Sequence, residues 1–377
     1  MVSPSAREVG RTVRKNCDIS DAVHCGIYSV CTLVLKLRQL FKWQHGLEPW
    51  QEPEPKEVLA WIDKKENGWE TVQNEEFAPL PVNGGAVDPF AVEIVNRELR
   101  GTGLSYGAGY GRSLKPVFFL AEIVAEREMA GHPVTILGRE LARELASPFA
   151  MAQDERIIIR RDPLRFFLYD QIREIRRSGQ EALGYSLRRY GIAGEDGRPD
   201  PALLIERLDA IVEGELGLFL HHELGEMRIS PADRELTRKL ALFFAGSAIE
   251  FAARAVQDLV ADTDGQGTLG YVLRERKETS LGFYVAFLDP LRETLFPEIR
   301  PAARRFFRTG DWDPVREAVA AGRRRNLARS AVIREICRDL AEENRERLAA
   351  DLEEELLRPL GLGKAQPAPR PGEDRPE

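Results

Sequence analysis

The chain has 377 residues, of which 43% are hydrophobic and 31% are charged, and its formal net charge is −7. These proportions are those of an ordinary globular protein with room for two or three packed units. The acidic balance argues against binding to nucleic acid or to anionic membranes through general electrostatic attraction. The apolar runs are too short to span a bilayer, and no apolar segment follows the basic N-terminus. We therefore expect a cytoplasmic protein without a secretory signal.

Four cysteines in a chain of this length do not make a disulfide scaffold. Three of them lie near the N-terminus together with His24, but their spacing lacks the Cys-x-x-Cys pair of structural zinc sites. We therefore expect free thiols that pack as small apolar side chains.

In the first 160 residues the sequence predicts helices followed by strands. Residues 1–16 are polar and are expected to be flexible, and residues 74–113, which are rich in proline and glycine, are expected to be largely irregular. Helices are predicted near residues 18–41, 56–65 and 91–99. Strands are predicted over residues 117–128, 134–137 and 155–160. The first of these strand segments is also compatible with a helix, because its apolar run lacks clean alternation.

From Asp162 onward the chain is predicted to be almost entirely helical, because Asp162 and Pro163 form a helix start signal and apolar residues then recur at helical spacing. The predicted helices lie near residues 163–178, 180–190, 201–228, 232–262, 279–295, 299–308, 313–345 and 347–359. The last fifteen residues contain four prolines and no apolar periodicity, which is typical of a disordered tail.

The fold expected from this pattern is mainly α: a helical bundle with a small antiparallel β-sheet in the middle third of the chain, that is, an α+β protein. No internal repeat and no sustained heptad pattern is apparent, so neither a solenoid nor a coiled coil is expected. Four segments are expected along the chain: a flexible N-terminus (1–16), an N-terminal α+β region with a glycine-rich loop (17–161), a helical domain (162–362) and a disordered tail (363–377).

The run His221–Glu226 is chemically the most informative segment. His222 and Glu226 are four residues apart and Glu223 and Glu226 are three apart, so these side chains can share one side of a helix. In the predicted helix 201–228, His222 and Glu226 continue the apolar stripe that should face the core. A carboxylate in such a place is costly unless it meets a cation, a hydrogen-bond donor or a metal ion. Glycines near the middle of this helix could break it and rotate the face.

The pattern His-Glu-x-x-Glu at residues 222–226 partly resembles the His-Glu-x-x-His helix of zinc peptidases. On this comparison His222 and Glu226 are candidate metal ligands, and Glu223 is the candidate catalytic base. A glutamate in place of the second histidine shifts the preferred divalent metal from zinc toward iron or manganese. Two alternatives stay open: a metal-free polar or catalytic cluster, and a purely structural role.

The predicted helix 232–262 carries further acidic groups. Asp258 and Asp262 are four residues apart near its end. If this helix pairs antiparallel with its predecessor directly after the connection, Glu250 lies roughly 25 Å from Glu226 by helical rise. This geometry argues against a metal site that Glu226 and Glu250 share.

The segment Gly101–Gly111 is a second candidate site. Arg112 and Lys115 follow it, and its glycine density suits a loop whose backbone amides and neighbouring cations meet an anion. It matches neither the phosphate-loop pattern nor the dinucleotide-binding pattern. Arg112 and Lys115 are therefore candidate ligand-binding residues, with a mobile or tightly turned structural loop as the alternative.

Four short segments carry a family resemblance: Gly109–Lys115, Phe166–Ile172, His221–Glu226 and Asp258–Thr263. They resemble an uncharacterised family of bacterial proteins found in sulfate-reducing and syntrophic anaerobes, and the resemblance covers most of residues 17–360. It implies a bacterial and cytoplasmic protein, but it implies neither a reaction nor site residues.

Two hypotheses about function follow from these observations. In the first, the protein is a metal-dependent hydrolase whose centre contains His222, Glu223 and Glu226, with Fe, Mn or Zn as the metal. In the second, it is a non-enzymatic interaction or assembly protein whose charged amphipathic helices from residue 313 to 360 contact a protein partner or a second copy. Neither hypothesis includes a nucleic acid or a membrane as partner.

Overall fold

The structure is a computed structural model that describes residues 4–82, 84–111, 114–153 and 155–362. In this part of the chain helices predominate, and the strands lie between residues 80 and 160. The predicted mainly helical α+β class, with small sheets in the middle third, is confirmed. The predicted tail, residues 363–377, lies outside the described residues, and the division into domains at residue 161 stays a prediction.

The N-terminal layer consists of helices α1 (Pro4–His24), α2 (Val30–Gln44), α3 (Pro55–Val72) and α4 (Val92–Glu98). The segment expected to be flexible is therefore helical from residue 4 onward. Val9 and Val13, four residues apart, are buried in a core that they share with strands of the sheet. This short apolar stripe anchors the helix although basic residues surround it.

The main sheet consists of strands β3 (Leu104–Tyr110), β4 (Pro116–Met129), β5 (His132–Arg143), β6 (Ala150–Gln153) and β7 (Arg156–Arg160). Their order is β3-β4-β5-β7-β6, and neighbours are antiparallel except β5 and β7. These two are parallel because the chain forms the edge strand β6 before it returns as β7, so the expected antiparallel sheet is in fact mixed. Residues 117–128 lie in β4, which makes them strand and not helix. Strands β1 (Leu80–Val82) and β2 (Gly85–Val87) form a separate hairpin.

The glycine-rich segment contains a strand where a loop was expected. Within β3, Gly107 pairs directly with Phe119 of β4. A Cβ added at Gly107 would overlap the ring of Phe119, which is fully buried. The missing side chain therefore makes room for an aromatic ring on the sheet.

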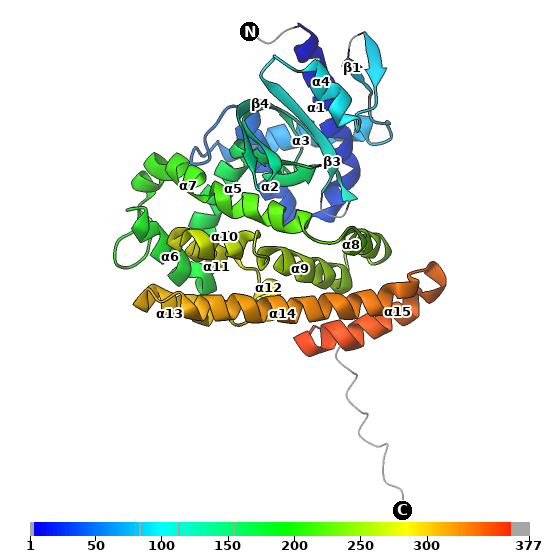
Figure 1. Cartoon of the computed structure of the whole chain (residues 1–377). Coiled ribbons are helices and arrows are strands. Elements are labelled where there is room, and N and C mark those ends of the chain that lie inside the picture. Colours follow the sequence, from blue (N-terminus) through cyan, green and yellow to red (C-terminus); the bar gives the residue numbers. More distant parts are fainter. Residues whose placement is uncertain (1–3, 83, 112–113, 154, 363–377) are drawn as a thin grey trace, which may run out of the picture.

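The helices after the sheet are α5 (Arg161–Glu174), α6 (Gln180–Arg189), α7 (Pro201–Met227), α8 (Pro231–Phe243), α9 (Ala248–Asp262), α10 (Thr268–Glu275), α11 (Glu278–Phe287), α12 (Pro290–Leu295), α13 (Ile299–Thr309), α14 (Asp313–Ile336) and α15 (Arg345–Leu352). They enclose the largest apolar core of the molecule. Helix α7 packs between strands β6 and β7 and helix α9, and α9 packs in turn against the long outer helix α14 (Figure 1). The layers therefore follow each other from sheet to α7, α9 and α14.

The single helix expected over residues 232–262 is in fact two helices. Gly246 adopts a left-handed conformation with φ of 71°, and the side chain of Ser247 accepts a hydrogen bond from the backbone N–H of Glu250 to begin α9. The chain therefore changes direction between α8 and α9, and α9 runs back along α7. This break decides which residues of α9 meet the candidate site.

Among the described residues, no helix combines the length and the apolar character that a membrane span requires. The four cysteines are free thiols. Cys17 and Cys337 are buried, as expected for small apolar side chains, whereas Cys25 is half-buried and Cys31 is exposed.

Candidate metal centre

The predicted site residues of helix α7 lie on one unbroken helix. The glycines that could have interrupted it, Gly214 and Gly217, make room for tyrosine rings instead. A Cβ added at these positions would overlap the hydroxyl of Tyr190 or of Tyr271, respectively. The helical phase inferred from the sequence is therefore preserved as far as Glu226.

Helix α9 runs antiparallel to α7 and brings two further carboxylates to it. Gly225 allows the close approach, since an added Cβ there would overlap the backbone of Ala261. Asp262 consequently faces His222, and Asp258 lies one turn earlier on the same helix. This register differs from the one expected for a single long helix, because α8 carries the chain away before α9 returns.

His222 is held by a chain of hydrogen bonds. Its Nδ1 lies 2.7 Å from Oδ1 of Asp262, which also accepts a 3.0 Å hydrogen bond from Oγ1 of Thr268. The other carboxylate oxygen of Asp262 accepts a 3.1 Å hydrogen bond from the hydroxyl of Tyr284. The Nε2 of His222 faces Glu226, whose Oε1 lies 3.5 Å away. A carboxylate on one imidazole nitrogen, with the second nitrogen turned toward other ligands, is the usual arrangement around metal-binding histidines.

His222, Glu226 and Asp258 are candidate metal ligands, and together they are named the metal-ligand group. Each offers one ligand atom, and these three atoms lie within 4.8 Å of one another. The exposed fractions of the His222 and Glu226 side chains are 25% and 36%, so solvent reaches the group. The Oδ2 atom of Asp258 pairs with the guanidinium of Arg292 in α12. Arg292 thus orients Asp258 and offsets part of the negative charge.

The protonation states of these groups depend on one another. Burial disfavours the charged imidazole of His222, but Asp262 and Glu226 outweigh burial and hold the pKa of His222 well above its usual value. Against the effect of burial, His222 lowers the pKa of Glu226 and the pKa of Asp262. Burial raises the pKa of Asp258, although Arg292 and His222 oppose this shift. Without a metal ion His222 is therefore an imidazolium between carboxylates, and a metal ion would have to displace its proton.

Glu223, the predicted catalytic base, is buried beside the metal-ligand group. Burial and the negative charge of Glu226 raise the pKa of Glu223 to about 8, while His222 and the backbone N–H of Ala152 in β6 partly offset the shift. The carboxyl group is thus protonated at neutral pH and lies where α7 meets the sheet. A pKa this close to neutrality suits a group that transfers protons.

Two other polar side chains of α7 and α9 have structural partners. His221 stacks on Tyr271 with ring centroids 4.3 Å apart, and its Nδ1 lies 2.7 Å from the backbone oxygen of Gln266. Glu250 pairs with Arg254 at 3.2 Å near the start of α9. Glu250 is not a member of the metal-ligand group. The distance expected from the sequence assumed one helix over residues 232–262, which is in fact two helices, so that distance does not apply.

The second candidate site involves Lys115, whose ammonium group has internal partners. Its Nζ lies 2.7 Å from Oδ1 of Asp21 and 3.0 Å from Oγ of Ser20, and its side chain is 1% exposed. Arg112 lies outside the described residues. Ligand binding by Arg112 and Lys115 therefore stays a prediction, and a ligand would have to compete with Asp21 for Lys115.

Sequence reasoning did not identify Asp258 as a candidate metal ligand or Asp262 as the hydrogen-bond partner of His222. The available signal was their spacing of four residues, which places both on one face of a helix near its end. The missing information was the register between α7 and α9.

The fold and the site define a mainly helical α+β protein with a partly buried histidine–carboxylate centre. The chain belongs to a family of unknown function, DUF6866: the model of its N-terminal domain matches residues 8–160, and the model of its C-terminal domain matches residues 165–355. No curated protein and no solved structure matches the chain. The resemblance to an uncharacterised family is thus confirmed. The metal-ligand group lies within the C-terminal match, and the family description assigns no activity to it.

Proposed function

We propose that the protein binds a divalent transition metal through His222, Glu226 and Asp258 and uses it for hydrolysis. The observation that supports this most directly is the hydrogen bond between Nδ1 of His222 and Asp262, together with the position of Nε2 facing carboxylates. A surface ion pair would not require a buried aspartate that two hydroxyl groups hold in place. The same features are typical of the groups that orient a histidine toward a metal.

The donor set favours iron or manganese over zinc, and the charge balance favours a divalent ion. One imidazole nitrogen and two carboxylate oxygens combine the ligand types that these metals accept. Without a metal, the carboxylates of Glu226, Asp258 and Asp262 outnumber the cations of His222 and Arg292 by one. A divalent ion in place of the imidazolium proton makes the whole group neutral, which lowers the cost of holding three carboxylates together.

Glu223 supplies the acid–base group of the proposed reaction. A bound divalent metal lowers the pKa of a water ligand to about 7 and so provides a nucleophile at neutral pH. The negative charge of Glu226 helps to raise the pKa of Glu223 to about 8. A metal cation bound to Glu226 would neutralise part of this charge and would lower the pKa of Glu223. Glu223 then titrates closer to neutrality and can accept a proton from water and pass it to a leaving group.

Two alternatives from the sequence analysis are a metal-free acid–base cluster and an assembly protein. The metal-free cluster uses the same residues as the metal site, and the absence of metal from the purified protein would favour it. For the assembly hypothesis, Val332 is the one exposed large apolar side chain among the described residues from 330 to 360. An apolar stripe that a partner helix could cover is not apparent in that stretch.

We also propose that the protein works in the bacterial cytoplasm without a nucleic acid or membrane partner.

Metal binding is tested by titrating the chelator-treated protein with Mn²⁺, and separately with Fe²⁺ and Zn²⁺. One equivalent should bind to the wild type and should be lost in His222→Ala and in Glu226→Gln. Two variants serve as matched controls: Glu206→Gln, at an exposed position of the same helix, and His132→Ala, at the start of β5. Both should bind like the wild type. Equal binding by all of these proteins, or none by any of them, would refute the site.

Hydrolysis is tested with chromogenic carboxylic and phosphoric esters of 4-nitrophenol. Glu223→Gln should keep the metal but lose turnover, because Gln cannot transfer a proton. Circular dichroism checks that the variant is folded. A Glu223→Gln protein with wild-type turnover would exclude the acid–base role, and a metal-loaded wild type that hydrolyses none of the esters would confine the proposal to metal binding.

A further inference from the structure

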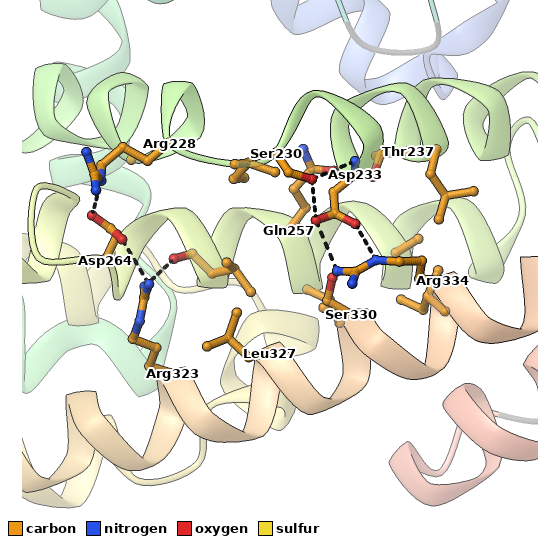
Figure 2. A pocket seen from close by; sticks show the side chains of 17 residues that line it. Arg228, Ser230, Asp233, Thr237, Gln257, Asp264, Arg323, Leu327, Ser330 and Arg334 are labelled. Atoms are coloured by element: carbon orange, nitrogen blue, oxygen red, sulfur yellow. Dashed lines mark hydrogen bonds and ion pairs between the residues drawn. The ribbon is translucent and has the colours of Figure 1, made fainter. Parts of the chain in front are cut away.

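A cavity lies on the side of helices α7 and α9 that faces away from the metal centre. It has a volume of about 220 Å³ and is lined by the end of α7, by helices α8 and α9 and by the outer helix α14 (Figure 2). Val260 lines it, whereas Asp258 and Asp262, two residues to either side, belong to the metal centre. Residues two apart lie on nearly opposite faces of a helix. The cavity is therefore separate from the metal centre although both use the same two helices.

The charged side chains of the cavity carry a net positive charge in an otherwise acidic protein. At one end Arg228 and Arg323 pair with the same carboxylate, that of Asp264, at 3.1 and 2.9 Å. At the other end Arg334 pairs with Asp233 at 2.8 Å. Figure 2 shows these two groups at opposite ends, with Leu327 between them. Since Asp264 balances only one of its two arginines, the excess positive charge lies at the Arg228–Arg323 end.

The middle of the cavity is apolar. Val256, Val260 and Leu327 contribute to its apolar lining, and Gln257 is among its uncharged polar side chains. An apolar middle beside a cationic end suits a ligand that has an apolar body and one negatively charged group.

We propose that this cavity binds a small organic monoacid. Its carboxylate lies at Arg228 and Arg323, and its apolar body lies against Leu327. One unit of excess positive charge matches a carboxylate better than a doubly charged phosphate. The volume exceeds the roughly 150 Å³ of a cavity that holds benzene and is smaller than the roughly 300–1,000 Å³ of drug-sized pockets, which indicates about ten non-hydrogen atoms.

The test is calorimetric titration of the full chain with hexanoate, benzoate and 4-hydroxybenzoate, each beside its neutral amide. At least one acid should bind at a single site, and about tenfold more tightly than its amide, because the amide lacks the charge that the arginines recognise. Failure of all three acids to bind, or equal binding of acid and amide, would overturn the proposal.

Variants locate the binding. Arg228→Gln should weaken the acid about tenfold, and Leu327→Trp should abolish binding because the larger ring fills the cavity. Leu327 is 43% exposed, so this change need not disturb the core. Arg316→Gln, at an exposed ion pair of the same outer helix, is the matched control and should bind like the wild type. Unchanged binding by Leu327→Trp would place the acid elsewhere and refute the assignment.

The proposal does not depend on the metal centre. Chelator-treated protein and His222→Ala should bind the acid as well as the wild type does, because His222 lies outside the cavity lining. Loss of acid binding in His222→Ala would show that the acid is a ligand of the metal centre, and the separate cavity site would then be wrong.

Discussion

Metal binding at His222 should release a proton and should strengthen as the pH rises. Asp262 and Glu226 hold the pKa of His222 well above its usual value, so between pH 6 and pH 7.5 a metal ion has to displace the proton. Each pH unit below that pKa then weakens the apparent affinity about tenfold, or about 1.4 kcal/mol. Asp262→Asn removes the negative charge beside Nδ1 and should return the pKa of His222 toward its usual value.

Asp262→Asn has two expected effects: it lowers the pKa of His222, and it orients the imidazole less well. The number of protons released on metal binding reports only the first effect. With a pKa near its usual value of about 6.5, His222 would release only about a tenth of a proton at pH 7.5. The wild type, in which the pKa of His222 is raised, should release more. The variant should also bind the metal about 10- to 100-fold more weakly at high pH, because Asp262 no longer orients the imidazole. Glu223, with its pKa of about 8, could add a proton, so both proteins are compared in the Glu223→Gln background.

The assay is calorimetric titration with Mn²⁺ at pH 7.5 in two buffers that differ in ionisation enthalpy. The difference in heat between the buffers gives the number of protons released. Equal heats for the wild-type centre would mean that no proton leaves, which would refute the protonated state of His222 in the metal-free protein. An unreduced proton release in Asp262→Asn would show that Asp262 does not control the protonation of His222. Glu206→Gln, far along α7, should behave like the wild type.

Glu223→Gln should stabilise the metal-free protein by about 2–3 kcal/mol more at pH 9 than at pH 6. The unfolded carboxyl is ionised at both values, whereas the folded one, with its pKa of about 8, stays protonated until the pH approaches 8, so the cost of folding with Glu223 rises up to that pH. Urea unfolding at the two pH values measures this, and an equal gain at both would contradict it. Gly225→Ala should cost about 1–3 kcal/mol through overlap with the backbone of α9, whereas Gly68→Ala in α3, where space is open, should gain about 0.5–1 kcal/mol. If thermal unfolding shows stability changes of the same sign for both variants, the contact between Gly225 and the backbone of α9 is not tight. Lys115→Met should cost about 3–5 kcal/mol, because the carboxylate of Asp21 stays buried without its cation, and adding Asp21→Asn should recover part of the loss. A Lys115→Met protein with wild-type stability in urea would show that this buried pair does not support the fold.

Local periodicity predicted the helix that carries the site. Helix α7 spans residues 201–227, and its ends and phase follow from a proline start signal and from apolar residues at helical spacing. The spacing of His222 and Glu226 could be read in the same way, because neighbours four residues apart are set by the helix itself. The sequence could not show whether the helix continues through Gly214 and Gly217, because the tyrosine rings that occupy the space beside these glycines come from elsewhere in the chain.

The glycine-rich strand and the N-terminal helix show where such reasoning fails. Glycine density favours a loop on average, but Gly107 is explained by the ring of Phe119 on the neighbouring strand. Val9 and Val13 alone are a weak helical signal, and they become an anchor because strands far along the chain cover them. In both cases the deciding contact is long-range.

By itself the sequence determined the mainly helical class, the sheet in the middle third, and a polar face with His222, Glu223 and Glu226 on one helix. Only the tertiary structure decided which carboxylates meet that face. The break at Gly246 ends α8 and lets α9 return, which sets Asp262 against His222 and Asp258 near Glu226. Spacing within a helix is a local property of the backbone, whereas the register between two helices depends on where the chain turns and on which side chains leave room for close packing.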